Sequence, residues 1–156
     1  MSKGERISEF VAGLGSGGEV STTAEVARNA YYLSYFRCWN EQRYYEAHDV
    51  LEHLWLVTSS EDHAYFKGLI QAAGAFVHLQ KHFEHPQHPK HGRRLRPAVR
   101  LFQLAERNLT PFRPLRHGFD VDSLCDLLRE KCQQIVDSDY TLNPWSPETA
   151  PKLEVR

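Results

Sequence analysis

The segment from about residue 61 to residue 83 constrains the fold most, because it is apolar around most of its circumference when drawn as a helix. The only interruption is a narrow stripe formed by Lys67, Gln71, Gly74 and His78. A helix on the surface of a protein has one apolar face, whereas a helix that is apolar on nearly all sides packs against several neighbours. We therefore predict a central helix here, with other helices placed around it.

Four further segments carry apolar residues at the helical spacings of three and four. They span residues 22–40, 42–57, 95–109 and 120–138. Thr22 with Glu25 forms a capping-box signature, and Asp120 is a good N-cap for the last segment. No stretch shows the convincing alternation of a β-strand. The sequence therefore predicts an all-α, single-domain bundle of about five helices, mostly antiparallel.

The length of 156 residues fits one helical domain with an extension at each end. Residues 1–21 are rich in glycine and are expected to form a flexible N-terminal segment. Residues 22–138 form the predicted helical domain. Residues 139–156 contain several prolines and are expected to form an extended C-terminal tail, held in place by Trp145.

Composition and motifs argue against several classes of function. A formal net charge of −1 argues against nucleic acid as a partner. No stretch is apolar over the roughly 18 residues of a membrane span, so we expect a cytoplasmic protein without a membrane partner. A G-x-G-x-x-G match at residues 13–18 lacks a preceding strand, so no nucleotide cofactor is expected. The three cysteines lack C-x-x-C spacing, which favours reduced thiols.

A polar cluster is predicted where residues 42–57 face the central helix. Its members are His48, Glu52, Trp55, Gln71 and His78. His48 and Glu52 are four residues apart and share one helical face, and Trp55 follows three residues later on the same side. The last two members occupy the polar stripe of the central helix. The side chains predicted to point to solvent instead are Glu46, Asp49 and His53.

The same residues carry a resemblance to a known family. The string NEQRYYEAHDVLEHLW at residues 40–55, followed by KGLIQAAGAFVHLQK at residues 67–81, closely resembles the helical bacterial and archaeal family of the domain of unknown function 309. The resemblance covers roughly residues 36–110. Two features differ from the family pattern: Asp49 replaces a more frequent glutamate, and the loop at 84–92 replaces a short Gly-Asn connection. The resemblance implies an all-α bundle with these residues clustered, and it implies no activity.

Four interpretations of the cluster stay open. The favoured one is a structural network in which Glu52 accepts hydrogen bonds from neighbours such as His48 and Gln71. In the second, His48, Glu52 and His78 bind a divalent metal ion, because imidazole and carboxylate together suit zinc, iron or manganese. In the third, His48 and Glu52 act as acid and base, although no nucleophile accompanies them. The fourth is a protein-interaction module, with a homo-oligomer left open. The sequence assigns no reaction, substrate or catalytic residue.

Two further patterns are assigned to solvent-exposed surface. Four histidines recur at every third residue, namely His82, His85, His88 and His91. The prolines between them favour polyproline II, in which neighbouring rings stand too far apart to share an ion. Arg96, Arg100 and Arg107 share one face of the segment at 95–109 and are interpreted as a solvated helix face.

Overall fold

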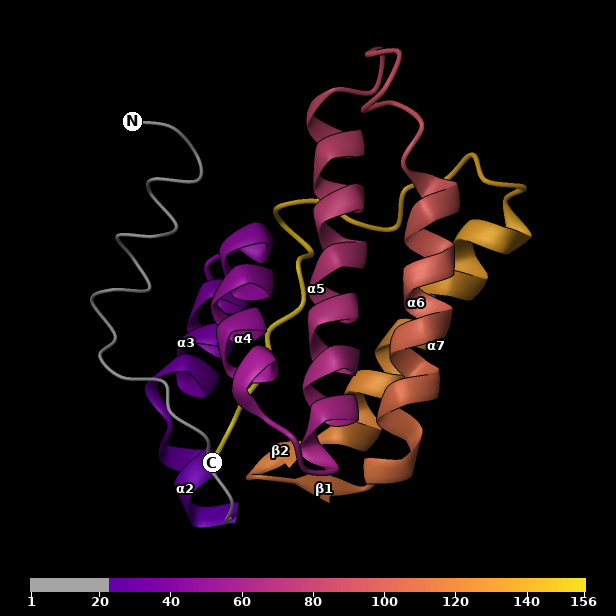
Figure 1. Ribbon diagram of the computed structural model, residues 1–156. Helices are drawn as coiled ribbons and strands as arrows, with labels where there is room; N and C mark the ends of the chain where they lie inside the picture. The colour runs from indigo at the N-terminus through magenta and orange to yellow at the C-terminus, as the bar shows by residue number, and fades with distance from the viewer. Residues whose placement is uncertain (1–22) are drawn as a thin grey trace, which may run out of the picture.

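The computed structural model describes residues 23–156 and confirms the predicted all-α bundle (Figure 1). Its helices are α2 (Thr23–Arg28), α3 (Ala30–Asn40), α4 (Tyr44–Val57), α5 (Asp62–Glu84), α6 (Leu95–Leu109) and α7 (Val121–Asp137). None of these helices is both long and apolar enough to cross a membrane. The predicted flexible segment at 1–21 and the predicted helix start at Thr22 lie outside the described residues.

Helix α5 is the central helix, as the sequence predicts, and it packs against α4 and α6. Helices α5 and α6 run antiparallel, side by side, and have the most extensive contact in the bundle (Figure 1). A Cβ atom at Gly68 would lie only 2.7 Å from Cγ of Leu109. Glycine at this position of α5 is therefore what allows the two helices to approach so closely.

The prediction of one continuous helix over residues 22–40 was wrong, because Asn29 separates α2 from α3. The backbone of Asn29 is extended, with φ −68° and ψ 132°, and its side chain accepts hydrogen bonds from the amides of Tyr31 and Tyr32 at 2.9 and 3.2 Å. Asparagine is a favoured N-cap because its side-chain oxygen satisfies these free amides. The apolar periodicity continues across the break and so conceals it.

Aromatic rings join the helices in the core. The ring of Phe76 on α5 lies 4.8 Å from Trp39 on α3, 5.5 Å from Tyr44 on α4 and 5.5 Å from Phe102 on α6, centroid to centroid. All four side chains are buried. Four helices therefore meet at one residue of the central helix.

The loop between α5 and α6 does not form the predicted polyproline II segment; it turns back on itself. The amide of Gly92 donates to the carbonyl of His88 at 2.9 Å, and a Cβ atom at Gly92 would lie 2.3 Å from the carbonyl oxygen of Pro86. Nδ1 of His88 accepts from the amides of Lys90 and His91. The imidazole of His88 thus acts as a local cap that the sequence pattern did not reveal.

A short hairpin connects α6 to α7. It follows a 3₁₀ turn, η1 (Thr110–Phe112), and pairs β1 (Leu115–Arg116) with β2 (Phe119–Asp120) in antiparallel register. Two residues per strand are too few for alternation to be recognised in the sequence. As predicted, Asp120 caps α7: its side chain accepts from the amide of Ser123 at 3.0 Å.

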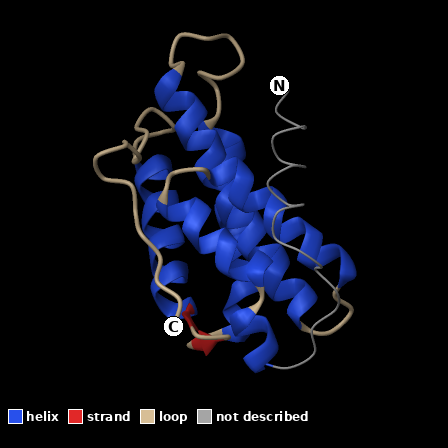
Figure 2. Ribbon diagram, turned by 90° about the vertical axis from the view of Figure 1, so that its left-hand side faces the viewer, coloured by secondary structure: helices blue, strands red, loops and turns tan. Residues whose placement is uncertain are grey.

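The C-terminal tail crosses the bundle and returns to the hairpin, where the C-terminus lies (Figures 1 and 2). Trp145 is buried and its indole Nε1 donates to the hydroxyl of Tyr44 at 3.0 Å. Further along, Asn40 exchanges two hydrogen bonds with the backbone of Leu153, both of 2.7 Å. These contacts hold the tail against α3 and α4, with Trp145 as the predicted anchor.

We expect Tyr44→Phe to lower the free energy of unfolding by about 1–2 kcal/mol, because it leaves the buried indole N–H of Trp145 without an acceptor. Urea denaturation measures the change. In Trp145→Phe the indole is absent, so adding Tyr44→Phe to that variant should cost clearly less. Additive losses in this double-mutant cycle would show that the hydrogen bond does not stabilise the tail.

Candidate functional site

Three potential metal ligands lie together on α4. Nδ1 of His48 is 3.0 Å from Oδ1 of Asp49 and 3.7 Å from Oε2 of Glu52. One ligand atom from each residue lies within 4.8 Å of the other two, and no other group of three His, Cys, Asp or Glu residues within 23–156 meets this spacing. The side chains are 33%, 25% and 43% exposed, in that order. An imidazole and two carboxylates that reach solvent form a plausible ligand set for a divalent ion.

Asp49 was predicted to point away from this site, and that prediction was wrong. Successive residues of a helix are separated by about 100°, which places Asp49 beside His48 rather than beneath it. The short carboxylate nevertheless reaches Nδ1, the ring nitrogen nearest the backbone, and hydrogen-bonds to it. A helical wheel gives the angular position of each Cα atom, but it does not show which neighbouring atoms a side chain can contact.

His48 lies beside Gly74, a member of the polar stripe of α5. A Cβ atom at Gly74 would lie 3.9 Å from Cδ2 of His48 and 3.1 Å from Cδ1 of Leu101 on α6. Gly74 therefore leaves room for an imidazole from one side and a leucine from the other. Gln71 and His78 precede and follow Gly74 by one helical turn on the same stripe.

The other predicted members of the cluster have different partners. Oε1 of Gln71 accepts from Nδ2 of Asn108 on α6 at 2.7 Å. The ring of Trp55 stacks on His63 with centroids 4.6 Å apart, and its buried Nε1 has no hydrogen-bond partner. Within residues 23–156, no hydrogen bond joins Gln71, His78 or Trp55 to the pair formed by His48 and Glu52.

His78 contacts a cation. Its Nδ1 lies 3.2 Å from NH1 of Arg94, which donates to it. Burial, together with the smaller effects of the nearby charges of Arg94 and Lys81, lowers the pKa of His78 to about 4. The ring is therefore neutral at pH 7. An arginine at hydrogen-bond distance opposes a metal ion at this imidazole, so the geometry favours Asp49 over His78 as the third ligand.

A second polar cluster, which sequence reasoning missed, lies between the start of α5 and the hairpin. Oδ1 of buried Asp62 hydrogen-bonds to Nε of Arg116 at 2.9 Å and to Nε2 of His117 at 2.7 Å. The hydroxyls of Tyr32 and Tyr65 lie 2.8 Å apart, and Tyr32 donates to the carbonyl of His117. His117 has a positive φ of 48° and a buried Nδ1 without a partner. No motif links these residues, because the contact joins positions 54 and 55 residues apart.

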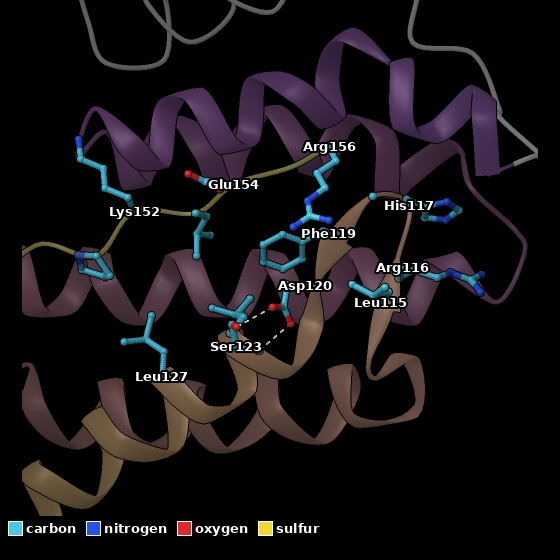
Figure 3. A pocket seen from close by; sticks show the side chains of 14 residues that line it. Leu115, Arg116, His117, Phe119, Asp120, Ser123, Leu127, Lys152, Glu154 and Arg156 are labelled. Atoms are coloured by element: carbon cyan, nitrogen blue, oxygen red, sulfur yellow. Dashed lines mark hydrogen bonds between the residues drawn. The ribbon is translucent and has the colours of Figure 1, made fainter.

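A cleft of about 730 Å³ lies beside this cluster, between the hairpin, the first turns of α7 and the tail (Figure 3). Its wall is largely apolar, with Phe119, Leu127 and Leu153 among the lining residues. The side chain of Arg156 extends toward Phe119 (Figure 3). The carboxylate of Asp120 accepts two hydrogen bonds from Ser123 (Figure 3). The cleft contains none of the three potential ligands on α4.

Comparison with known proteins gives one match. The family model of a domain of unknown function (DUF309) matches residues 32–85, which include most of α3 and all of α4 and α5. No curated protein and no solved structure matches the chain. The matched segment contains His48, Asp49 and Glu52, and the description of the family assigns no activity. The match at residues 32–85 is to the same family that the sequence motifs resemble.

Proposed function

We propose that this protein binds a divalent transition-metal ion through His48, Asp49 and Glu52. The observation that carries the proposal is the mutual distance of their ligand atoms, all within 4.8 Å. One nitrogen and two oxygen ligands suit zinc, iron or manganese. Relative to the ligand set considered from sequence, Asp49 takes the place of His78.

Partial exposure supports a metal site more than a structural network. A polar network that specifies a fold is buried and has its hydrogen bonds satisfied within the protein. Here the three side chains remain between one quarter and one half exposed, and within the described residues their hydrogen bond and ion pairs join them to one another. Three protein ligands on an accessible face leave coordination positions for water or a substrate, which is the arrangement of reactive metal sites.

The metal proposal is tested by titrating zinc into the purified, metal-free protein and following the heat of binding. We expect one site per chain. In His48→Ala the affinity for zinc should fall by about tenfold or more, because one of three protein ligands is removed. His53→Ala is the matched control, since His53 lies on the same helix but is exposed and outside the group. Equal affinity in the wild type and in His48→Ala would refute the site.

Denaturation of Glu52→Gln in the absence of metal separates the structural interpretation from this one. Exposed ion pairs contribute little to stability, so we expect a change within about 0.5 kcal/mol. A structural network would lose about 1–3 kcal/mol, because an amide would replace an acceptor-only group. With zinc present, the wild type should melt at a higher temperature than without it, and Glu52→Gln should gain less.

We further infer that the protein works in a reducing compartment such as the cytoplasm and does not use nucleic acid as a partner. All three cysteines are free, and Cys38 and Cys125 are buried. The near-zero net charge supports the second inference, because nucleic-acid affinity depends on a positive electrostatic field.

A further inference from the structure

Arg94 lies at the junction of the 85–92 loop with α6 and is surrounded by imidazoles. Its NH1 donates to Nδ1 of His78 at 3.2 Å, and its NH2 donates to Nδ1 of His91 at 2.6 Å. Its backbone amide approaches Nδ1 of His82 at 3.5 Å. These histidines come from α5 and from the loop, so Arg94 joins two segments that are separated in the sequence.

Among the residues that the structure describes, the charge of Arg94 has no acidic counterpart. Within residues 23–156, no ion pair or hydrogen bond connects Arg94 to a carboxylate. The charged groups that act on His78 are Arg94 and Lys81, and those that act on His91 are Arg94, His88, Lys81 and His85. Every one of them is basic. A half-buried arginine is normally paired with a carboxylate, so this site carries an uncompensated positive charge.

The guanidinium of Arg94 also has unused donors. An arginine carries five N–H groups, and two of them serve His78 and His91. Among the described residues Nε has no partner, but it is buried, so the donors left for an anion are the second N–H groups of NH1 and NH2. Planar N–H pairs of this kind match the oxygens of a phosphate group. In the first turn of α6, the amides of Leu95 and Arg96 add partial positive charge, whereas Pro97 has no N–H and the amide of Ala98 donates to the carbonyl of Arg94.

We propose that this junction is a binding site for a phosphate group, with Arg94 as its principal ligand. The exposed side chains of Lys90 and Arg93, next to it in the chain, raise the local positive potential. The imidazoles of His78 and His91 orient the guanidinium by accepting from it in their neutral form. The site is distinct from the three ligands on α4, so the two proposals succeed or fail independently.

The test is a titration with inorganic phosphate at constant ionic strength, with chloride as the balancing anion, followed by heteronuclear NMR of the full chain. We expect saturable chemical-shift changes at Arg94, His91 and the start of α6. In Arg94→Gln the affinity for phosphate should fall by about tenfold or more. Arg107→Gln is the matched control, because Arg107 is exposed at the other end of the same helix. Arg94→Lys preserves the charge and should retain part of the binding, which separates loss of the ligand from loss of the local fold.

Two further arms identify the source of the phosphate. A soluble phosphate monoester and vesicles that contain phosphatidic acid are titrated in the same way. Tighter binding of the monoester assigns a soluble metabolite, and tighter binding of the vesicles assigns a lipid headgroup. Binding that is unchanged in Arg94→Gln, or that chloride displaces as well as phosphate does, would overturn the proposal.

Discussion

Replacing Asp62 with alanine is expected to lower the free energy of unfolding by about 3–5 kcal/mol, because the change leaves the buried His117 and the partly buried Arg116 without this acceptor. Oδ1 of Asp62 interacts with Nε and NH2 of Arg116 at 2.9 and 2.6 Å and with Nε2 of His117 at 2.7 Å. The side chains of Asp62 and His117 are only 7% and 2% exposed. Arg116 keeps its contact with Glu61, but the buried His117 finds no replacement acceptor in water without opening the hairpin, and urea denaturation measures that cost.

Glu61→Ala is the matched control for Asp62→Ala. Glu61 contacts the same NH2 group of Arg116 at 3.0 Å, but its side chain is 73% exposed. An exposed ion pair contributes about 0–1 kcal/mol, so the control should change stability very little. Losses of similar size in the two variants would contradict the assignment of the buried network as a stabilising element.

The same network predicts a particular response to acid. Burial alone raises the pKa of Asp62, but hydrogen bonds from His117 and Arg116 outweigh it, and the net pKa lies below the ordinary value of 3.8. A pKa lowered by folding stabilises the protein fully above the pKa of the unfolded chain. This stabilisation is lost as the pH falls from that value through the pKa of the folded state. Asp62→Asn should therefore be less stable at neutral pH, and its stability should decline less below pH 4 than that of the wild type.

The helices were predictable because their signals are local. The apolar circumference of α5 and the cap at Asp120 depend on residues within a few turns of one another, and both appear as expected. The break at Asn29 was missed because the apolar pattern runs through it. The folded 85–92 loop was missed because a histidine side chain, rather than a turn residue, caps its amides.

The sites were less predictable because they depend on how helices are placed against each other. His48 and Glu52 could be paired from their spacing, which one helix determines by itself. The partner of Gln71 could not, because Asn108 reaches it only through the register of α6 against α5. The contact of Asp62 with His117 likewise requires the hairpin, whose strands are too short to be recognised in sequence. The apolar periodicity of a sequence thus predicts individual helices but not how those helices are placed against one another.

Phe76→Ala is expected to lower the free energy of unfolding by about 3–5 kcal/mol, the range for removing a fully buried phenylalanine. The loss combines the transfer of the ring to water with the cavity that remains. Collapse of that cavity is opposed because the neighbours Trp39, Tyr44 and Phe102 belong to three different helices. If one of these three rings moved into the cavity, its helix would lose contacts with the other helices. Denaturant melts give the loss, and Phe76→Leu, which retains most of the volume, should cost less than about 1.5 kcal/mol.

Phe83 offers the control on the same helix. Its side chain is 43% exposed, and its ring lies 5.5 Å from Trp145 in an edge-on contact. Phe83→Ala therefore removes one aromatic pair without leaving an enclosed cavity, and we expect a loss of about 1 kcal/mol or less. If Phe76→Ala costs no more than Phe83→Ala, then the four helices do not share one core at Phe76, and α5 is not the element around which the bundle is packed.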